Sequence, residues 1–500
     1  MSSGGPFILS INTTEEDELI FKQKSLLRVI ANLNAVKVKK IFELNPDISV
    51  SKLLKVSYEN LPTFSEIEQI NFFNTVYKPI IAMTSVYSKT TPIQGQKKLG
   101  TTTVFTLPIY GEFIADAAIH CTLTGLSAVS ALDRVKYVDF LGHKMIKKIS
   151  LKLNNKTVSS YGPDKYNIFY DCKLKNDLQS GYNKLVGQEN PVIAQLNPDI
   201  DLEYVQFIPL GLGAQTFKQT QDTVEMMIPL LFWFNNLKTP LPNYMLTQGT
   251  TQIEVEFESS DLLISVYNGG GGGGYNLPVM STCDLYLNHL YVDTVVMDMF
   301  KKYFKFQLIR TDQWFIEEIK NNSGNLYLQK FRGLIECLYI GFRPKSNYLD
   351  GKKWYKNLYL TTSSVNIPVV DEVLTIGYNQ ANYYNEYSMI KNVGITLNGN
   401  VINTYMPGIH YSTYVPFIRG VKTPKEGWLS FCYNQNQDVY QPSGHLSTLT
   451  IREMYLNYEG NVVSGVDVIR SDNPANVIGY AECLNFLIVD DKGGAILKYT

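Results

Sequence analysis

Alternation of apolar and polar residues is strongest in Gln252–Glu258, where each apolar residue is followed by an acid. Because successive side chains point to opposite faces of a strand, this segment predicts a strand with one buried face. Ile146–Leu153 shows a similar alternation. Met226–Phe234 is apolar throughout and predicts a strand that is buried on both faces.

Other segments rich in β-branched and aromatic residues recur along the chain, separated by turn residues. They are Thr101–Pro108, Cys283–Val292, Tyr303–Arg310, Leu334–Phe342, Val393–Leu397, Trp428–Tyr433, Leu446–Tyr458 and Leu484–Asp490, with a hairpin turn and a last strand in Gly493–Tyr499. Ala115–Leu132 is compatible with a helix or with a buried strand and a loop. Many short strands with little βαβ alternation predict an all-β sandwich or barrel and not a doubly wound sheet.

The N-terminal stretch has a different pattern. Residues 1–12 are rich in glycine and serine and then apolar at Phe7–Leu9, which predicts an arm that packs on a partner surface. Thr13–Glu16 has the form of a capping box, and apolar residues follow it at helical spacing. We expect a helix over about residues 14–33.

Six consecutive glycines lie just past the middle of the chain: Gly269, Gly270, Gly271, Gly272, Gly273 and Gly274. Ordering such a run costs much conformational entropy, so we expect a flexible loop or linker. A phosphate-binding loop would need a Gly-Lys-Ser/Thr sequence directly afterwards, and none follows. The run therefore predicts a junction between two domains.

The chain is nearly neutral, with 45 Lys and Arg against 46 Asp and Glu. We therefore expect no electrostatic binding to nucleic acid or to an anionic membrane. No signal peptide or membrane-spanning apolar run is evident. The six cysteines lie scattered and mostly within apolar stretches: Cys121, Cys172, Cys283, Cys337, Cys432 and Cys483. Without any Cys-x-x-Cys motif, they predict buried free thiols in a reducing compartment.

Recognisable catalytic patterns are missing from the sequence. A cupin-type metal site would need a His-x-His pair with a nearby Glu, but the five histidines are isolated: His120, His143, His289, His410 and His445. No His-Glu-x-x-His, Gly-x-Ser-x-Gly or phosphate-binding motif occurs. The sequence predicts a protein that is not an enzyme and that needs no metal or cofactor.

One pentapeptide links two apolar, strand-like segments near the C-terminus: Gln441, Pro442, Ser443, Gly444 and His445. The proline fixes its own φ, and the glycine can adopt backbone angles that a Cβ would forbid. The segment predicts a sharp corner that leads into a long strand. Its histidine fits a structural role, with a ring nitrogen bound to a backbone carbonyl, better than a role as ligand or acid–base group, because no partner is nearby in the sequence.

The same pentapeptide carries a family resemblance. Tyr440–His445 resembles the signature of major capsid proteins of nucleocytoplasmic large DNA viruses, and further stretches narrow the resemblance to the African swine fever virus type. These stretches occur in the family's order across nearly the whole chain: Ser3–Gly5, Gly181–Glu189, Phe232–Asn235, Leu308–Arg310, Tyr414–Phe417, Leu484–Leu487 and Lys498–Thr500. Each stretch is weak alone, but the ordered set is specific.

The resemblance implies two consecutive eight-stranded jelly rolls, preceded by an arm and a helix. We therefore expect the arm and helix in residues 1–40, a first jelly roll in 41–265, a glycine-rich linker or loop in 266–280 and a second jelly roll in 281–500. The implied function is that of a structural major capsid protein. Its homotrimers would form pseudo-hexagonal capsomers that tile an icosahedral shell.

The resemblance also implies partners and a location. The partners are further copies of the chain, neighbouring capsomers, minor capsid and penton proteins, a virus-encoded folding chaperone and, indirectly, the inner membrane layer, with no direct contact to nucleic acid. The location is the outer capsid of the virion, after assembly in the host cytoplasm. Two alternatives stay open: a poxvirus-like double jelly-roll scaffold that shapes the immature virion membrane, and a glycan-binding β-sandwich protein.

Overall fold

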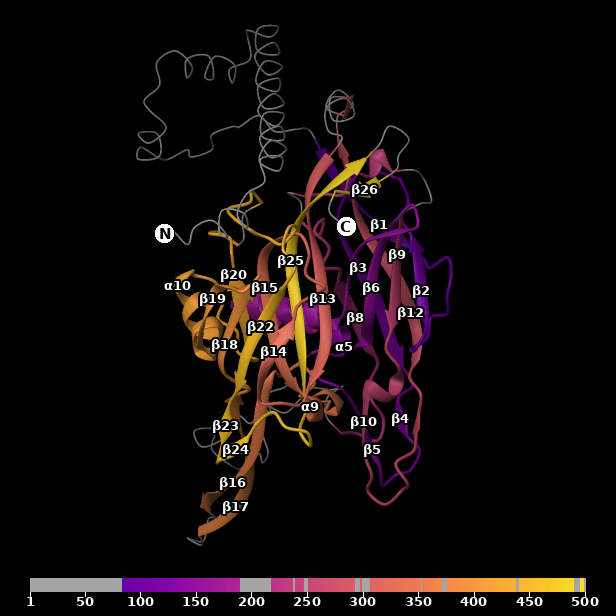
Figure 1. Ribbon diagram of the computed structural model, residues 1–500. Helices are drawn as coiled ribbons and strands as arrows, with labels where there is room; N and C mark the ends of the chain where they lie inside the picture. The colour runs from indigo at the N-terminus through magenta and orange to yellow at the C-terminus, as the bar shows by residue number, and fades with distance from the viewer. Residues whose placement is uncertain are drawn as a thin grey trace, which may run out of the picture.

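Figure 1 shows a computed structural model in which two β-sandwiches lie side by side, the first coloured indigo to magenta and the second mainly orange to yellow. The structure describes residues 83–188, 217–236, 239–246, 251–292, 297–298, 306–351, 353–370, 376–437, 440–489 and 495–498. The arm predicted for residues 1–40, with its helix near residues 14–33, lies outside these described residues.

The first sandwich consists of two antiparallel four-stranded sheets. One sheet has the strand order β1 (Met83–Thr90), β12 (Val279–Val292), β3 (Phe113–Thr124) and β8 (Val224–Pro229). The other has the order β2 (Thr102–Thr106), β9 (Thr251–Phe257), β6 (Ile146–Leu153) and β7 (Lys156–Tyr161). Burial alternates from residue to residue along β3 and β9, so every second side chain enters the space between the sheets.

The second sandwich repeats this arrangement. One of its sheets has the core order β13 (Phe306–Ile319), β25 (Ala475–Val489), β15 (Leu334–Pro344) and β20 (Trp428–Cys432), with β21 (Leu446–Ser447) and β26 (Ala495–Leu497) attached. The other has the order β14 (Ser323–Tyr327), β22 (Met454–Gly460), β18 (Ile390–Leu397) and β19 (Asn400–Pro407). Each half of the chain thus builds a sandwich around two four-stranded sheets, as expected of two jelly rolls, and the two short strands β21 and β26 extend one sheet of the second.

Short strand pairs and helical segments connect the sheets. The pairs are β4 (Ser127–Ala128) with β11 (Tyr275–Asn276), β5 (Arg134–Tyr137) with β10 (Ile264–Tyr267), β16 (Leu358–Val370) with β17 (Ile376–Ser388), and β23 (Val462–Val463) with β24 (Val466–Asp467). The α-helices are α5 (Leu141–Met145), α6 (Pro163–Ile168), α7 (Gln179–Leu185), α9 (Lys345–Leu349) and α10 (Val415–Ile418). The remaining segments are the 3₁₀-helices η2 (Asn176–Leu178), η5 (Asn243–Met245) and η6 (Ser260–Leu262) and the π-helices η1 (Phe169–Lys173) and η7 (His410–Tyr414).

Two apolar cores fill the sandwiches. The core of the first sandwich includes Phe105 and Val255 and continues into the second half of the chain through Tyr339 and Tyr480. A separate core fills the second sandwich. The apolar packing therefore joins the two halves as well as stabilising each one. Among the described residues, no helix is both long and apolar enough to cross a membrane.

Most of the predicted strands are confirmed. The prediction for Ile146–Leu153 coincides with β6, and that for Gln252–Glu258 differs from β9 by one residue at each end. Ala115–Leu132, which was compatible with two structures, forms a strand and a loop, because β3 reaches Thr124 and β4 follows.

Several of the strand predictions are wrong in extent. Those for Tyr303–Arg310 and Leu484–Asp490 fall nine residues short, because β13 continues to Ile319 and β25 begins at Ala475. Met226–Phe234 is not one fully buried strand, because β8 ends at Pro229 and its burial alternates. Leu446–Tyr458 is not one long strand either, because a turn divides it into β21 and β22. These two strands belong to opposite sheets of the second sandwich, so the chain crosses from one sheet to the other between them.

The glycine run does not join the two halves. It lies between β10 and β11, and β12 after it pairs with β1 and β3 of the first sandwich. The pairing of β12 places residues 281–292 in the first half, against the expected start of the second jelly roll at residue 281. The order of strands along the chain does not reveal this pairing, because strands that are adjacent in a jelly-roll sheet are far apart in the sequence.

The glycine run is also held in place by hydrogen bonds. The carboxylate of Asp133, which is fully buried, accepts bonds from the backbone N–H groups of Gly269 (3.0 Å), Gly271 (3.1 Å) and Gly273 (2.8 Å). Successive N–H groups that converge in this way form an anion-binding concavity. The run is therefore a loop wrapped around an internal carboxylate and not a free tether.

We expect Gly269→Ala to destabilise the chain by about 1–3 kcal/mol, because a Cβ there would lie 2.1 Å from the carbonyl oxygen of Leu132. Gly274→Ala is the matched control, since its Cβ would meet nothing closer than 3.5 Å, and we expect a change within about 0.5 kcal/mol. Thermal unfolding of both variants measures the difference. If both variants had the same melting temperature, the glycine run would be a free tether and not a packed loop.

Candidate functional site at the junction of the two sandwiches

One short stretch of the first sandwich makes most of the polar contacts to the second. We call residues 163–173 the junction segment; it comprises α6 and the π-helix η1 that continues it. Gly162 precedes it in an extended conformation and Pro163 occupies its first turn, where a missing N–H group costs nothing. The segment ends where Leu174 returns to extended backbone.

A buried ion pair lies at the start of the junction segment. Arg343 of β15 donates from Nη2 to Oδ1 of Asp164 at 2.5 Å, and the two side chains are only 2% and 6% exposed. The Nε of Arg343 also donates to Asn357 at 3.2 Å. Next to this pair, the backbone N–H of Gly162 donates to the Tyr480 hydroxyl at 2.9 Å. Buried charges of this kind are stable only when geometry and further hydrogen bonds compensate for desolvation.

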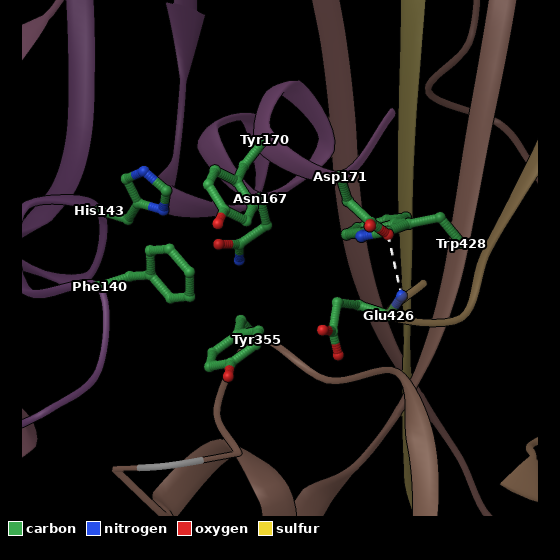
Figure 2. A pocket seen from close by; sticks show the side chains of 8 residues that line it. All are labelled: Phe140, His143, Asn167, Tyr170, Asp171, Tyr355, Glu426 and Trp428. Atoms are coloured by element: carbon green, nitrogen blue, oxygen red, sulfur yellow. Dashed lines mark hydrogen bonds between the residues drawn. The ribbon is translucent and has the colours of Figure 1, made fainter. Parts of the chain in front are cut away.

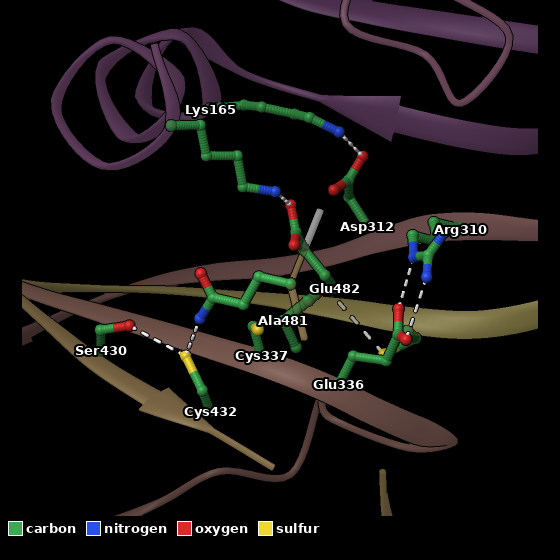
Figure 3. A network of polar contacts seen from close by, with 12 residues as sticks. Lys165, Arg310, Asp312, Glu336, Cys337, Ser430, Cys432, Ala481 and Glu482 are labelled. Atoms are coloured by element: carbon green, nitrogen blue, oxygen red, sulfur yellow. Dashed lines mark hydrogen bonds and ion pairs between the residues drawn. The ribbon is translucent and has the colours of Figure 1, made fainter. Parts of the chain in front are cut away.

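Further along the segment, two lysines form ion pairs with the second sandwich, as Figure 3 shows for Lys165 and Asp312. Lys173 pairs in the same way with Glu482 of β25. Burial raises the pKa of Asp312. Burial also disfavours ionised Glu482, but the positive charges around it, Lys173 foremost, outweigh this effect and lower its pKa. The acids on β13 and β25, Asp312 and Glu482, thus each form an ion pair with a lysine of the junction segment.

Asp171, near the end of the junction segment, binds backbone instead of side chains. The Asp171 carboxylate accepts hydrogen bonds from the N–H groups of Lys425 (2.8 and 3.0 Å) and Glu426 (3.0 Å). Figure 2 shows the bond from Glu426 at the rim of a small cavity between the sandwiches. The cavity has a volume of about 20 Å³, enough for about one water molecule. Asp171 therefore fixes the loop that leads into β20.

Aromatic rings and one neutral histidine line the same cavity (Figure 2). His143 is fully buried, stacks on Phe140 with ring centroids 5.2 Å apart, and shares a 2.8 Å hydrogen bond with the Tyr182 hydroxyl. Burial lowers the pKa of His143 to about 3, so the ring stays neutral at physiological pH. A neutral, enclosed ring of this kind packs the junction and does not exchange protons with a substrate.

Glu426 carries one of the two carboxyl groups that line the cavity, the other being that of Asp171. Burial raises the pKa of Glu426 to about 7, with further contributions from the negative charges of Asp171 and Glu386, although Lys356 opposes them at 3.4 Å. A carboxyl group with this pKa changes its charge near neutral pH. The junction thus contains one group whose protonation responds to ordinary changes of pH.

A larger cleft of about 360 Å³ lies beside the ion pairs and is lined by both sandwiches. Its charged lining residues include Lys165, Lys173, Asp312 and Glu482, which pair with one another. Among the described residues, no group of three or more His, Cys, Asp or Glu side chains is placed to hold a metal ion. The charged groups of the junction therefore connect the two sandwiches to each other.

The predicted corner, residues 441–445, lies outside the junction segment and precedes β21, which pairs with the start of β15. The β21 strand that follows it pairs Ile335 with Leu446. The hydroxyl of Ser443 accepts hydrogen bonds from the N–H groups of Gln435 (3.1 Å) and Asn436 (2.8 Å), so it ties the corner to the preceding loop.

Two residues next to this serine fix the shape of the corner. Gly444 has φ 138°, in the region that favours glycine, and His445 is half-buried. The carbonyl of Tyr440, just before the corner, accepts a 3.4 Å hydrogen bond from Arg310. That arginine binds Glu336 through Nε at 2.5 Å and Nη2 at 3.1 Å. The corner is therefore linked to the polar network of β13 and β15.

Sequence reasoning missed the junction segment. Its only local signal is Gly162-Pro163-Asp164, which is typical of a helix start. Its partners Arg343, Asp312 and Glu482 lie far away in the sequence. Each stands one or two residues outside a predicted strand segment, because those segments were chosen from their apolar residues alone.

For the corner, we expect Gly444→Val to be the most damaging substitution, by about 1–3 kcal/mol, because φ is positive and a Cβ would lie 2.8 Å from the Tyr433 carbonyl oxygen. Ser443→Ala loses its loop hydrogen bonds and should cost about 1–2 kcal/mol. Pro442→Ala and His445→Ala should cost less. Melting temperatures of the four variants give the ranking. A silent Ser443→Ala, or His445→Ala as the worst, would contradict this assignment.

For the cavity, the raised pKa of Glu426 predicts a pH-dependent effect. The unfolded carboxyl has its ordinary pKa of 4.5, so between pH 4.5 and about 7 the folded chain binds more protons at this group. Its stabilising contribution is present at low pH and is lost as the pH rises through about 7. Glu426→Gln should therefore raise the melting temperature relative to wild type, and by more at pH 8 than at pH 5.

Glu256→Gln is the control for this prediction, because Glu256 also pairs with a lysine, Lys147, but is 37% exposed and does not line the cavity. The melting-temperature difference between this variant and wild type should change little between pH 5 and pH 8. If Glu426→Gln showed no larger pH dependence than Glu256→Gln, the carboxyl of Glu426 would be charged across the whole range.

Comparison with known proteins identifies the family. A model described as the N-terminus of the major capsid protein matches residues 71–298, and one described as the large eukaryotic DNA virus major capsid protein matches residues 297–493. The hexon protein p72 of African swine fever virus is 22% identical over 669 aligned positions that cover 100% of both chains. Capsid protein 1 of Acanthamoeba polyphaga mimivirus is 22% identical over 48% of this chain and 40% of its own length.

Solved structures support the same fold. The Faustovirus major capsid protein superposes with a TM-score of 0.72 at 18% identity, covering 92% of this chain and 98% of its own. A chain of the PBCV-1 virus capsid gives 0.61 at 16% identity, covering 86% and 100%. The predicted double jelly roll is confirmed.

The relatives are structural capsid proteins and not enzymes, in agreement with the missing catalytic motifs. The two family models succeed one another along the chain, one for each half, and the curated relative aligns with all of it. The chain belongs to the major capsid protein family of large eukaryotic DNA viruses and is a structural component of the virion shell.

Proposed function

We propose that three copies of this chain close into a ring of pseudo-hexagonal outline, the capsomer from which the icosahedral shell is built. Each chain contributes two similar sandwiches, so three chains supply six similar units around one axis. A closed ring with rotational symmetry needs two different, complementary surfaces on each subunit. The observation that carries the proposal is a pair of exposed apolar patches, one on each sandwich.

The first of these surfaces, here called the tip patch, lies on η7 and α10 at the outer side of the second sandwich (Figure 1). It consists of Ile409 (69% exposed), Tyr414 (56%), Phe417 (73%) and Ile418 (63%). Large apolar residues gathered in this way mark interaction surfaces, whereas single exposed ones need no explanation. The tip patch supports a contact to another protein chain.

The second surface, here called the edge patch, lies on β1, the outermost strand of its sheet. It consists of Met83 (60% exposed) and Tyr87 (63%) on one face of the strand and Val86 (49%) on the other. An exposed edge strand with apolar side chains is a ready surface for pairing or packing with a second chain. Figure 1 shows β1 in the first sandwich and α10 on the far side of the second, so the two patches face different neighbours.

These features support a heterologous contact in which the tip patch of one chain meets the edge patch of the next. We further propose two structural units that divide near residue 297, where the two family models meet, instead of at residue 281. By family resemblance, neighbouring capsomers, minor capsid and penton proteins and a virus-encoded folding chaperone are proposed partners, and the host cytoplasm is the proposed place of assembly.

Light scattering coupled to size exclusion tests the ring. We expect three times the chain mass of 56.7 kDa for the wild type. Phe417→Glu places a charge in the tip patch and should convert the trimer to monomer without lowering the monomer's melting temperature. The matched control is Leu349→Glu on α9, which changes a residue of equal exposure (72%) outside both patches and should leave the trimer intact.

A wild-type monomer or dimer at micromolar concentration would overturn the trimer. A trimer that survives Phe417→Glu but is lost with Leu349→Glu would retain the ring and reject the tip patch as its contact. Either result is read from the same measurement of mass.

A further inference from the structure

Two pairs of cysteines face each other across antiparallel strands, one pair in each sandwich. Cys121 of β3 is in register with Cys283 of β12, and Cys337 of β15 is in register with Cys432 of β20. Directly opposed residues in such strands have Cα atoms about 4.5–5.5 Å apart. A disulfide bond needs about 4.4–6.8 Å, so both pairs have suitable backbone spacing.

Side chains confirm that each pair is in contact. In each pair the two thiols lie close enough for one to affect the pKa of the other: Cys283 raises the pKa of Cys121, and Cys432 raises that of Cys337. All six cysteines are free thiols in this structure, and five of them are buried. The sixth is Cys432, which is partly exposed. The two pairs therefore have the same spacing but differ in access to solvent.

The surroundings of Cys432 are polar, unlike those of the first pair. Its sulfur accepts a hydrogen bond from Gln437 and lies 3.2 Å from the Ser430 hydroxyl, a contact that Figure 3 shows beside Cys337. The positive charge of Arg419 also acts on it, with the negative Glu482 opposing. Cys121 and Cys283, by contrast, have no exposed surface and lie within the apolar core.

These contacts favour the thiolate at one sulfur of the pair. The hydrogen bond from Cys337, followed by that from Ser430 and the charge of Arg419, lowers the pKa of Cys432 to about 7 despite its burial. The same hydrogen bond and burial raise the pKa of Cys337 well above its ordinary value. Since the thiolate is the reactive form, Cys432 is the nucleophile and Cys337 the second thiol.

We propose that Cys337 and Cys432 form an oxidation site that reacts with small disulfides of the glutathione class and closes a disulfide bond between β15 and β20. Cys432 attacks the small disulfide, whose sulfur–sulfur bond breaks, and one thiolate leaves. Cys337 gives its proton to that thiolate and attacks the sulfur of Cys432, which releases the second small thiol. The two cysteines lose two electrons and two protons in total, and the small disulfide gains both.

This site would respond to the compartment in which the chain resides. In a reducing cell interior the pair stays open, and in an oxidising environment it closes. The bond would join β20, the outer strand of its sheet, to its neighbour β15. It would also constrain the unfolded chain over the long loop between the two cysteines, so the oxidised chain should melt at a higher temperature than the reduced one.

The test uses the full chain, purified with reductant, transferred to oxidised glutathione at pH 7.5 and then alkylated. Intact mass and peptide mapping without reductant should show the loss of two of the six thiols and a link between the peptides of Cys337 and Cys432. Cys121 and Cys283 should remain alkylatable after unfolding. Oxidation of Cys121 with Cys283 at the same rate, or a link from Cys432 to the neighbouring Cys172, would overturn the proposal.

Two variants separate the steps. Cys337→Ser should stop at a mixed disulfide, with glutathione attached to Cys432 and no rise in melting temperature. Cys432→Ser should acquire glutathione at neither position of the pair. Reaction of Cys337 in the Cys432→Ser chain would contradict the assignment of the nucleophile. If a variant fails to fold, the mapping of the wild-type chain still decides, because a stable glutathione adduct without a Cys337–Cys432 bond would also overturn the proposal.

Discussion

The buried ion pair between Asp164 and Arg343 is the constraint on which the relation of the two sandwiches depends. Both side chains are almost fully buried, so each charge relies on the other for compensation, and Arg343 also donates to the side-chain Oδ1 of Asn357. Removal of one partner would leave an unpaired charge in the interior, a loss that costs about 3–5 kcal/mol in other proteins. An apolar contact of the same area would tolerate sliding, whereas this pair fixes one position and one orientation.

A fixed orientation matters because the surfaces of a capsid subunit must fit those of its neighbours. The tip patch and the edge patch belong to different sandwiches, so their relative placement depends on the junction segment between them. The segment binds strands at its start, through Asp164, and a loop at its end, through Asp171. These two anchors, together with the ion pairs of Lys165 and Lys173, prevent rotation about any single contact. A small rotation at the junction would displace the patches by a larger distance at the rim.

The sequence predicted what local patterns encode and failed where the contacts are distant. Alternation identified β6 and β9 because period two is a local property of a half-buried strand. The partner of Asp164 lies 179 residues away and that of Lys173 lies 309 residues away, and no local pattern records such a pairing. The prediction for the glycine run failed for a related reason. Its composition predicts a flexible segment, but hydrogen bonds to Asp133, 136 residues away from Gly269, hold it in place.

The corner at Gly444 shows how a short motif can combine both kinds of information. Its positive φ was predictable, because only glycine adopts such angles without strain. The role of the turn was not predictable from the sequence. The strand after it is only two residues long, and the chain then crosses to the opposite sheet. A sharp turn is needed there since β21 must pair with the start of β15, which also pairs with β20 and β25. Such a crossing leaves room for few side chains, so a residue without a Cβ and a serine that binds the preceding loop fit the position on packing grounds.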